Sequence, residues 1–529
     1  MHRKKRITRR AVLKTLAMSV PLVGLGTRAL AVARRRPSRD VLGKNVVLFI
    51  TDQERAIQHF PVNWEQDNLP GLTRLKQTGL TFERAFTDAC MCSPARSTWM
   101  TGYFPAQHGV KYTLEEDMPA NQYPQVVLPL DLKNIASVMS AAGYNVVYKG
   151  KWHCSKPNGK HWVPRDVAQY GFQRWDPQDA GANQDIDQAG GGYADNDDRF
   201  MNDDGQWHAG KEGALAYLTS EAAAEQPFFM IISLVNPHDV LFYPNTYIDA
   251  GYNDSQLAGT INIPATNGED LSTKPTVQEQ FWVISQGLGV LDTPEKKRNY
   301  LNFYGNLMKA SDNYLVQVLD LLEQQNLIDN TLIIRTADHG EMGLTHHGQR
   351  QKNFNFYEES IRVPLVYSNP TLYPAPRSST ALVSHVDFLP TIASLFDVPE
   401  AARADWQGVD YSELVLEPSA SPVQDYVVFT YDDYQSGQKS GPYPGLPPFP
   451  PAPNHIASIR EERYKLAEYY DADCIVPSQW EMYDLANDPL ETTNIAFPDY
   501  PRTPEQQAQY DRLRAKLAEV KATRLQPLS

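Results

Sequence analysis

Cysteine is scarce in this chain, which has four cysteines among 529 residues. That number is too small for a disulfide scaffold. Cys90 and Cys92 are separated by one residue, which is poor geometry for a mutual bridge. The sequence also lacks an internal repeat, and beyond its N-terminal segment it lacks an apolar run long enough to cross a bilayer. We therefore exclude disulfide-rich and repeat classes and expect no stable membrane span.

Positive charge is also in deficit, with 49 Lys and Arg against 63 Asp and Glu. Residues 1–33 nevertheless carry eight basic and no acidic residues, followed by an apolar run and small residues. The stretch Thr8-Arg9-Arg10-Ala11-Val12-Leu13-Lys14 resembles a twin-arginine signal. We expect residues 1–33 to be a signal peptide, the twin-arginine translocase to be a transient partner, and the protein to be exported to the periplasm or beyond. Removing these eight charges would change the formal net charge from −14 to −22, which argues against nucleic acid as a partner.

Apolar, β-branched runs alternate with helical stretches along the rest of the chain. This alternation predicts an α/β fold with a mostly parallel sheet flanked by helices. The length suggests one large domain over 42–400 and a smaller C-terminal α+β subdomain over 425–525. Two long segments, 176–210 and 436–454, have loop composition. The predicted strands are 45–50, 144–148, 228–233, 331–335 and 363–367, and the predicted helices are 70–79, 95–101, 131–142, 211–225, 293–325, 386–396 and 503–523.

Acidic, amide and imidazole side chains follow two of these strands. Asp52 and Gln53 come after the first strand, and Asp338 and His339 come after the fourth. The carboxyl ends of parallel strands meet at one edge of a sheet, which is where ligands bind in such folds. We therefore predict an oxygen-rich site for a divalent metal at this edge.

Cationic and imidazole groups follow the other strands on the same predicted edge. Lys151 and His153 come after the second strand, His238 after the third, and Lys352 lies downstream of Asp338. A lysine can hold an anion and a histidine can move a proton. Each motif alone is compatible with a solvated loop, but together they indicate an active site.

The segment Cys92-Ser93-Pro94-Ala95-Arg96 has the features of a helix start. Proline favours the first turn, and Gly102 is a suitable end. Cys92 then lies just ahead of the helix, where free N–H groups favour negative charge, and Arg96 lies about one turn in. We expect Cys92 to be neither buried nor bridged. From the residues alone, a thiolate nucleophile remains open.

The run from Cys92 to Gly102 resembles the signature C-x-P-x-R-x-x-x-x-T-G of the formylglycine-dependent type I sulfatases, arylsulfatase-like members of the alkaline phosphatase superfamily. Segments 150–153, 358–364 and 483–494 are similar to further blocks of that family. The resemblance implies an alkaline phosphatase-like fold and hydrolysis of an organic sulfate monoester, small or saccharide, with release of inorganic sulfate.

The resemblance also implies cofactors and residue roles. Cys92 would be converted to Cα-formylglycine by a formylglycine-generating enzyme, a transient partner. The hydrated aldehyde would attack sulfur, and the resulting sulfate hemiacetal would collapse back to the aldehyde. The implied ligands of a divalent metal, most simply Ca²⁺, are Asp52, Gln53, Asp338 and His339; the implied catalytic residues are Cys92, Arg96, Lys151, His153, His238 and Lys352.

Two positions depart from the commonest family pattern, because many members have Asp where Gln53 stands and Asn where His339 stands. Both departures remove negative charge and leave Mg²⁺ and Mn²⁺ open. The alternatives are a phosphodiesterase or phosphonate monoester hydrolase on the same scaffold, a non-catalytic anion-binding protein, and a metal-dependent thiol enzyme. The aromatic residues that could line a substrate pocket are Trp64, Tyr103, Tyr112, Trp162 and Trp207, and His347 is a further candidate site residue.

Overall fold

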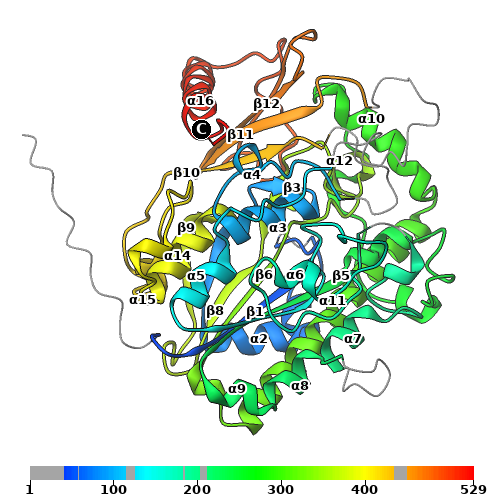
Figure 1. Ribbon diagram of the computed structural model, residues 1–529. Helices are drawn as coiled ribbons and strands as arrows, with labels where there is room; N and C mark the ends of the chain where they lie inside the picture. The colour runs from blue at the N-terminus through cyan, green and yellow to red at the C-terminus, as the bar shows by residue number, and fades with distance from the viewer. Residues whose placement is uncertain are drawn as a thin grey trace, which may run out of the picture. The chain divides into compact units, whose positions relative to one another are not determined.

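Two β-sheets organise the residues that the computed structural model describes, namely 41–56, 59–114, 125–182, 185–202, 211–433 and 450–528. All of these residues belong to one unit of the chain. The predicted signal peptide lies outside the described residues, as does most of the predicted loop 436–454. Figure 1 shows the strands and the helices around them.

The larger sheet has eight strands in the order β4-β5-β1-β6-β8-β2-β7, with β9 paired to β2. Strands β4, β5, β1 and β6 are mutually parallel, β8 is antiparallel to β6, and β9 is parallel to β2. The predicted mostly parallel sheet is therefore confirmed. Its strands are β1 (Asn45–Asp52), β2 (Gly79–Phe86), β4 (Asn145–Gly150), β5 (Phe228–Pro237), β6 (Thr331–Ala337), β7 (Arg362–Val363), β8 (Leu365–Ser368) and β9 (Arg377–Ser384).

Strand β1 is buried along its whole length, and this burial explains the unbroken apolar run from Val46 to Ile50. Leu48 and Ile50 belong to the core on one face of the sheet, whereas Val47 and Phe49 belong to the core on the other. Side chains alternate across a strand, so a strand covered on both faces needs apolar residues at every position.

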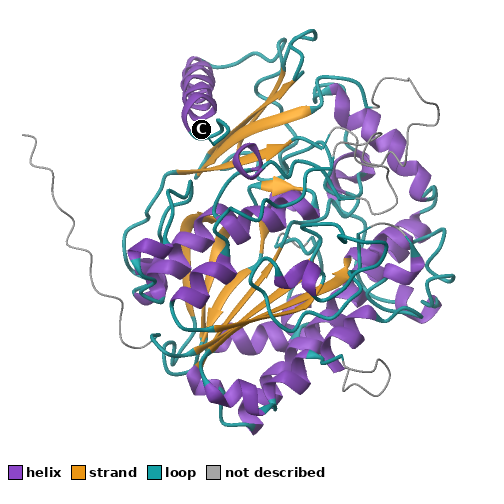
Figure 2. Cartoon of the chain, in the orientation of Figure 1, coloured by secondary structure: helices purple, strands orange, loops and turns teal. Residues whose placement is uncertain are grey.

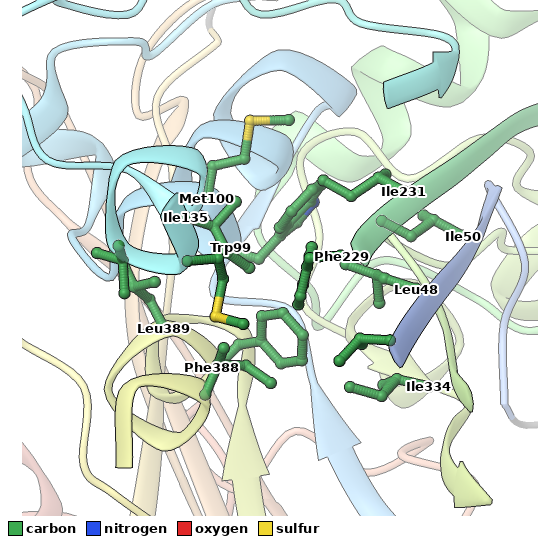
Figure 3. Close-up of a cluster of buried hydrophobic side chains, with 14 of the residues drawn as sticks. Leu48, Ile50, Trp99, Met100, Ile135, Phe229, Ile231, Ile334, Phe388 and Leu389 are labelled. Atoms are coloured by element: carbon green, nitrogen blue, oxygen red, sulfur yellow. The ribbon is translucent and has the colours of Figure 1, made fainter. Parts of the chain in front are cut away.

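Helices cover both faces (Figure 2). On one face α2 (Pro70–Gln77) packs against α11 (Pro294–Gln324), which also contacts β5. On the other face α14 (Phe388–Leu395) contacts both α3 (Cys92–Thr101) and α5 (Ile135–Ala141). Figure 3 shows Trp99 and Met100 of α3 among side chains of the sheet and of these helices. Helix α3 is thereby fixed against the central sheet.

Local chemistry sets several boundaries differently from the predictions. Helix α5 begins only after Asn134, whose side chain accepts hydrogen bonds from Ala136 N and Ser137 N. Segment 211–225 forms two short helices, α8 (Ala214–Leu218) and α9 (Glu221–Glu225), in place of one. The strand predicted over 363–367 is divided at Pro364, which has no N–H to donate to a ladder.

The second sheet has the order β13-β12-β11-β10-β3. Its antiparallel strands are β10 (Tyr426–Tyr431), β11 (His455–Glu461), β12 (Tyr464–Tyr470) and β13 (Gln479–Asp484), and α16 (Pro504–Thr523) packs on β11 and β12. This is the C-terminal sheet subdomain. Its fifth strand, β3 (Ala89–Cys90), was not predicted and pairs in parallel with β10, so that Cys90 lies opposite Tyr431.

The predicted loop 176–210 is more structured than expected. It contains η1 (Ile186–Gln188) and α7 (Asn196–Asn202), and its Asp179 and Asp197 are buried. None of the helices among the described residues is both long and apolar enough to span a bilayer. The remaining elements are α1 (Trp64–Asn68), α4 (Pro105–His108), α6 (Arg165–Ala168), η2 (His238–Phe242), η3 (Asp254–Leu257), η4 (Ala265–Gly268), α10 (Thr276–Ser285), η5 (Gln286–Leu288), η6 (Ile328–Asn330), α12 (Thr345–Gly348), α13 (Glu358–Ile361), η7 (His385–Asp387), η8 (Glu400–Ala402) and α15 (Ser412–Leu416).

Candidate active site

Cys92 is the first residue of helix α3 and is only 2% exposed. The expectation that it lies unburied ahead of the helix was therefore wrong. The reason is that its flanks are held in both sheets: β3 precedes it in the C-terminal sheet, and Trp99 anchors the helix to the central one. All four cysteines are free thiols in the structure.

The Cys92 thiol lies among charged and imidazole groups. Its Sγ is 3.2 Å from His339 Nε2 and 3.6 Å from Asp52 Oδ1. Burial, with a further contribution from Asp52, raises the pKa of Cys92 to about 11. An unmodified Cys92 is therefore a protonated thiol at neutral pH and a poor nucleophile.

Four side chains form a compact cluster of potential metal ligands, because single atoms of Asp52, Cys92, Asp338 and His339 all lie within 4.8 Å of one another. His339 Nδ1 is 3.1 Å from the carbonyl oxygen of Gly340, so we assign the ring proton to Nδ1. The lone pair on Nε2 then faces Asp52 Oδ1 at 3.8 Å and Asp338 Oδ1 at 3.6 Å. This arrangement is typical of a metal-binding imidazole.

The two carboxyl groups of the cluster differ in protonation. Burial raises the pKa of both, but the positive charges of Lys151 and Arg96 more than offset this effect at Asp52, whose pKa lies well below its ordinary value. Burial and the neighbouring Asp52 raise the pKa of Asp338 to about 7. A divalent cation between the two would relieve their mutual repulsion.

Gln53 follows β1 in a left-handed backbone conformation, with φ of 68°. Its backbone N–H donates to Asp338 Oδ1 at 3.1 Å. Its side-chain oxygen accepts from Lys352 Nζ at 2.5 Å, and its side-chain nitrogen donates to Glu341 Oε2 at 2.6 Å. The amide is thus held at both ends beside the cluster.

Two further buried cations contact the carboxylates. Arg96 donates from Nη2 to Asp52 Oδ2 and from Nε to Asp338 Oδ2, both at 3.1 Å. Lys151 Nζ donates to Asp52 Oδ2 at 2.5 Å. Arg96 also donates to Ser233 Oγ at 2.7 Å. Sequence reasoning missed Ser233, although it closes the strand that was predicted over 228–233.

His153 follows β4 and is held by a residue from the predicted loop. Asp179 accepts from the backbone N–H groups of Trp152 and His153, both at 2.7 Å. His153 Nε2–H donates to the carbonyl oxygen of Leu114 at 3.0 Å, while Nδ1 is buried without a hydrogen-bond partner. Burial, followed by Lys151 and Arg96, lowers the pKa of His153 well below its ordinary value. The ring is therefore neutral and its free nitrogen is a base.

His238 begins η2, directly after β5. Burial and then Lys151 lower its pKa well below the ordinary value, and Asp52, Lys352 and His339 also contribute to its electrostatic environment. The imidazole is thus neutral and lies within electrostatic range of the cluster.

Several of the remaining candidates lie elsewhere. His347 Nδ1–H donates to the carbonyl oxygen of Glu269 at 2.7 Å, and its ring packs against Trp282. Trp64, one of the aromatic residues considered for a substrate pocket, instead packs edge-on against Phe60 in the core on the α11 face. Trp162 is largely buried against the ring of Trp175. Trp207 lies outside the described residues.

Comparison with models of known protein families shows which family this chain belongs to. The family model described as Sulfatase matches residues 44–398. The chain belongs to the sulfatase family. A second family model, for the C-terminal region of N-sulphoglucosamine sulphohydrolase, matches residues 345–523. The predicted family is therefore confirmed, and the protein is a sulfatase, an enzyme that hydrolyses sulfate esters.

Named relatives agree with this assignment. The sulfatase is 24% identical to an ulvan-active sulfatase of Formosa agariphila, across 85% of this chain and 76% of the relative. It is 25% identical to a delta 4,5-hexuronate-2-O-sulfatase of Bacteroides thetaiotaomicron, across 79% of this chain and 77% of the relative.

Solved structures show the same fold. A 2-O GAG sulfatase superposes with a TM-score of 0.65 at 19% identity, covering 91% of this chain and 92% of the other. A protein solved with its substrate D-glucosamine-2-N,6-O-disulfate gives 0.63 at 19% identity, covering 91% and 98%. A phosphonate monoester hydrolase from Silicibacter pomeroyi gives 0.63 at 21% identity, covering 91% and 96%. The predicted fold of the sulfatase is confirmed.

Proposed function

We propose that this sulfatase releases inorganic sulfate from an organic sulfate monoester by means of a Cα-formylglycine made from Cys92. The observation that carries the proposal is the position of Cys92 Sγ, at the start of α3 and within 4.8 Å of ligand atoms of Asp52, Asp338 and His339. The hydrated aldehyde would supply a hydroxyl nucleophile at that position, which a thiol with a pKa of about 11 does not offer at neutral pH.

A divalent metal fits the donor set of this site. Two carboxylates, the amide oxygen of Gln53 and the unprotonated Nε2 of His339 are hard or borderline ligands. We propose Ca²⁺, held by Asp52, Gln53, Asp338 and His339. The ion, when bound, supplies Lewis-acid polarisation of the sulfuryl group and of the nucleophile. Metal analysis of the purified protein distinguishes Ca²⁺ from Mg²⁺ and Mn²⁺.

Three buried cations would bind and orient the sulfuryl group. Arg96, Lys151 and Lys352 have no exposed side-chain surface, and each contacts a residue of the proposed metal set. Fixed positive charge in a buried site stabilises the charge that develops on the sulfuryl oxygens in the transition state.

Two histidines would move the protons. His153 Nδ1, which has no partner, accepts the proton of the second hydroxyl when sulfate is expelled. His238, together with Lys352, protonates the leaving alcohol. An entering sulfate would offset the positive charge of Lys151, which lowers the pKa of His238 in the free enzyme, so that substrate binding favours the acidic form.

The test is tandem mass spectrometry of the tryptic peptide spanning 85–96, from protein purified out of its own host. We expect an aldehyde in place of the thiol at Cys92 and an unmodified thiol at Cys90, which serves as the internal control. A Cys92→Ala variant should fold and bind sulfate but not turn over. Full activity in protein whose Cys92 remains a thiol would overturn the proposal.

A phosphonate monoester or phosphodiester hydrolase is the second candidate. It is favoured by the amide at Gln53, by the imidazole at His339, and by the structural likeness to a phosphonate monoester hydrolase. The ratio of kcat/KM for aryl sulfate to that for the matched aryl phosphonate decides between the two activities. We expect the ratio to exceed one.

The organic part of the substrate and the cellular setting belong to the same proposal. Relatives named for ulvan and for hexuronate 2-O-sulfate support a saccharide sulfate. We propose export through the twin-arginine signal at 1–33, a catalytic domain over 42–400 and a C-terminal subdomain over 425–525, with a formylglycine-generating enzyme and the twin-arginine translocase as transient partners. Signal cleavage is checked by N-terminal sequencing of the periplasmic protein.

A further inference from the structure

The side-chain amide of Gln53 has two ends of almost equal size and opposite chemistry. Only its oxygen can bind a cation, because the NH₂ group has no available lone pair. A glutamine in a metal site is therefore useful only if its orientation is fixed. A carboxylate would have no such requirement, since either of its oxygens can bind a cation.

Charged groups of opposite sign fix the orientation in this enzyme. Lys352 Nζ, which can only donate, lies 2.5 Å from the amide oxygen of Gln53. The carboxylate of Glu341, which accepts, lies 2.6 Å from the amide nitrogen. Rotating the amide by 180° would set NH₂ against an ammonium and C=O against a carboxylate. The assignment of oxygen and nitrogen therefore follows from the charges around the group.

Glu341 is itself rigidly held. It has no exposed surface. Its second oxygen, Oε1, accepts from Tyr300 OH at 2.7 Å and from the backbone N–H groups of Gln351 at 3.0 Å and Gly343 at 3.1 Å. Three donors at Oε1 leave Oε2 for Gln53. The carboxylate thus joins α11, through Tyr300, to the segment that carries Lys352.

We propose that Glu341 is a positioning residue that turns the oxygen of Gln53 toward the metal and supplies, one hydrogen bond away, the negative charge that Gln53 itself lacks. This inference rests on the proposed metal site. It adds the feature that Gln53 and Glu341 act as one unit, in which the amide is the ligand and the carboxylate determines which of its ends is presented.

The identity of the donors around Glu341 predicts what a Glu341→Gln variant does. Tyr300 OH and two N–H groups require an oxygen at the Oε1 position, so the new NH₂ would occupy the Oε2 position and face the NH₂ of Gln53. Turning the Gln53 amide would only move the conflict to Lys352, so the side chain has to leave this position, and its oxygen is no longer held for the metal. In a Gln53→Glu/Glu341→Gln double variant, which keeps the side-chain length at both positions, the same NH₂ donates to the new carboxylate, and both the ligand oxygen and the charge are restored.

The experiment measures the Kd of Ca²⁺ by titration calorimetry on metal-stripped protein. Four proteins are compared: wild type, Glu341→Gln, Gln53→Glu and the double variant. We expect Kd to rise roughly 10- to 100-fold in Glu341→Gln, the range found for lost outer-shell partners. Gln53→Glu alone should also weaken binding, because it sets two carboxylates in contact. The double variant should recover to within about threefold of wild type, since the two changes compensate.

Glu54→Gln is the matched control, since Glu54 is buried beside Gln53 in sequence but pairs with Arg335. It should leave the Kd of Ca²⁺ near the wild-type value, and melting curves of the metal-free proteins report folding separately. An unchanged Kd in Glu341→Gln, or a double variant as weak as the weaker single one, would overturn the inference while the metal site stands. A wild-type protein that binds no divalent cation would overturn both.

Discussion

Asp179 is the residue on which the geometry of His153 depends, and replacing it with Asn tests that dependence. Asp179 accepts from Trp152 N and His153 N at 2.7 Å each, and from Ala180 N at 2.9 Å. Asn keeps one oxygen and sets an NH₂ group against one of the two N–H donors. His153 has a left-handed backbone with φ of 50°, a conformation that a non-glycine residue keeps only when its surroundings enforce it.

The magnitude follows from the one hydrogen bond that is lost. A hydrogen bond to a charged group contributes about 1.5–3 kcal/mol. If the free energy of this hydrogen bond is lost from the transition state because His153 is misplaced, kcat/KM falls by roughly 10- to 150-fold, at about 1.4 kcal/mol per factor of ten. The assay is sulfate release from an aryl sulfate by metal-loaded enzyme, with kcat and KM measured separately. The Kd of Ca²⁺ should not change, because Asp179 contacts none of the proposed ligands.

A double-mutant cycle makes this prediction refutable. In a His153→Ala background, Asp179→Asn should lower kcat/KM only slightly, since the imidazole that Asp179 positions is already absent. Wild-type kcat/KM in Asp179→Asn, or an equal loss in both backgrounds, would show that Asp179 does not act through His153. Circular dichroism and melting temperature identify a variant that has simply unfolded.

Three further outcomes are expected. Chelation should abolish sulfate release and lower stability, and Ca²⁺ at a hundredfold excess over its Kd should restore about 2.7 kcal/mol, measured by urea unfolding. Burial lowers the pKa of His346, but its ion pairs with Glu269 and Glu359 outweigh this effect and raise the pKa to about 9. The stabilisation by protonated His346 is therefore complete below pH 6.5 and is lost as the pH rises through about 9. The free energy of unfolding of a His346→Gln variant should lack this alkaline decline. Trp99→Ala removes the side chain that anchors α3 and should lower the free energy of unfolding by about 3–5 kcal/mol, also measured by urea unfolding.

The central sheet could be predicted because its signals are local. Strand β1 lies under helices on both faces, so its central residues Val46 to Ile50 are all apolar, and this run ends where Thr51 and Asp52 begin the polar edge. Parallel strands then bring Asp52 and Asp338 to the same edge, although 285 residues separate Gln53 from the carboxylate that its backbone contacts. Pattern and topology together were sufficient for the main cluster of the site.

The supporting residues could not be predicted, because their partners are distant in sequence and leave no periodic signal. Asp179 lies in a segment whose composition indicates a loop, and its function depends on backbone groups 26 and 27 residues earlier. Glu341 follows His339 by two residues and was within reach of the same strand-end reasoning. Its role, however, becomes visible only from the donors around both of its oxygens. Strand β3 has two residues, which is too short for any pattern.

The pairing of β3 with β10 has a consequence for the order of folding, proposed modification and proposed export. Cys90 lies opposite Tyr431, so the residues in front of Cys92 join a sheet whose other strands are made last during synthesis. Once that sheet has formed, a modifying enzyme would meet a cysteine that is 2% exposed. On the proposed function, conversion of Cys92 would therefore belong before the C-terminal sheet closes, and the proposed twin-arginine export, a route that carries folded protein, would belong after it. Formation of the last strands to be synthesised would then end the period in which the proposed nucleophile can be made.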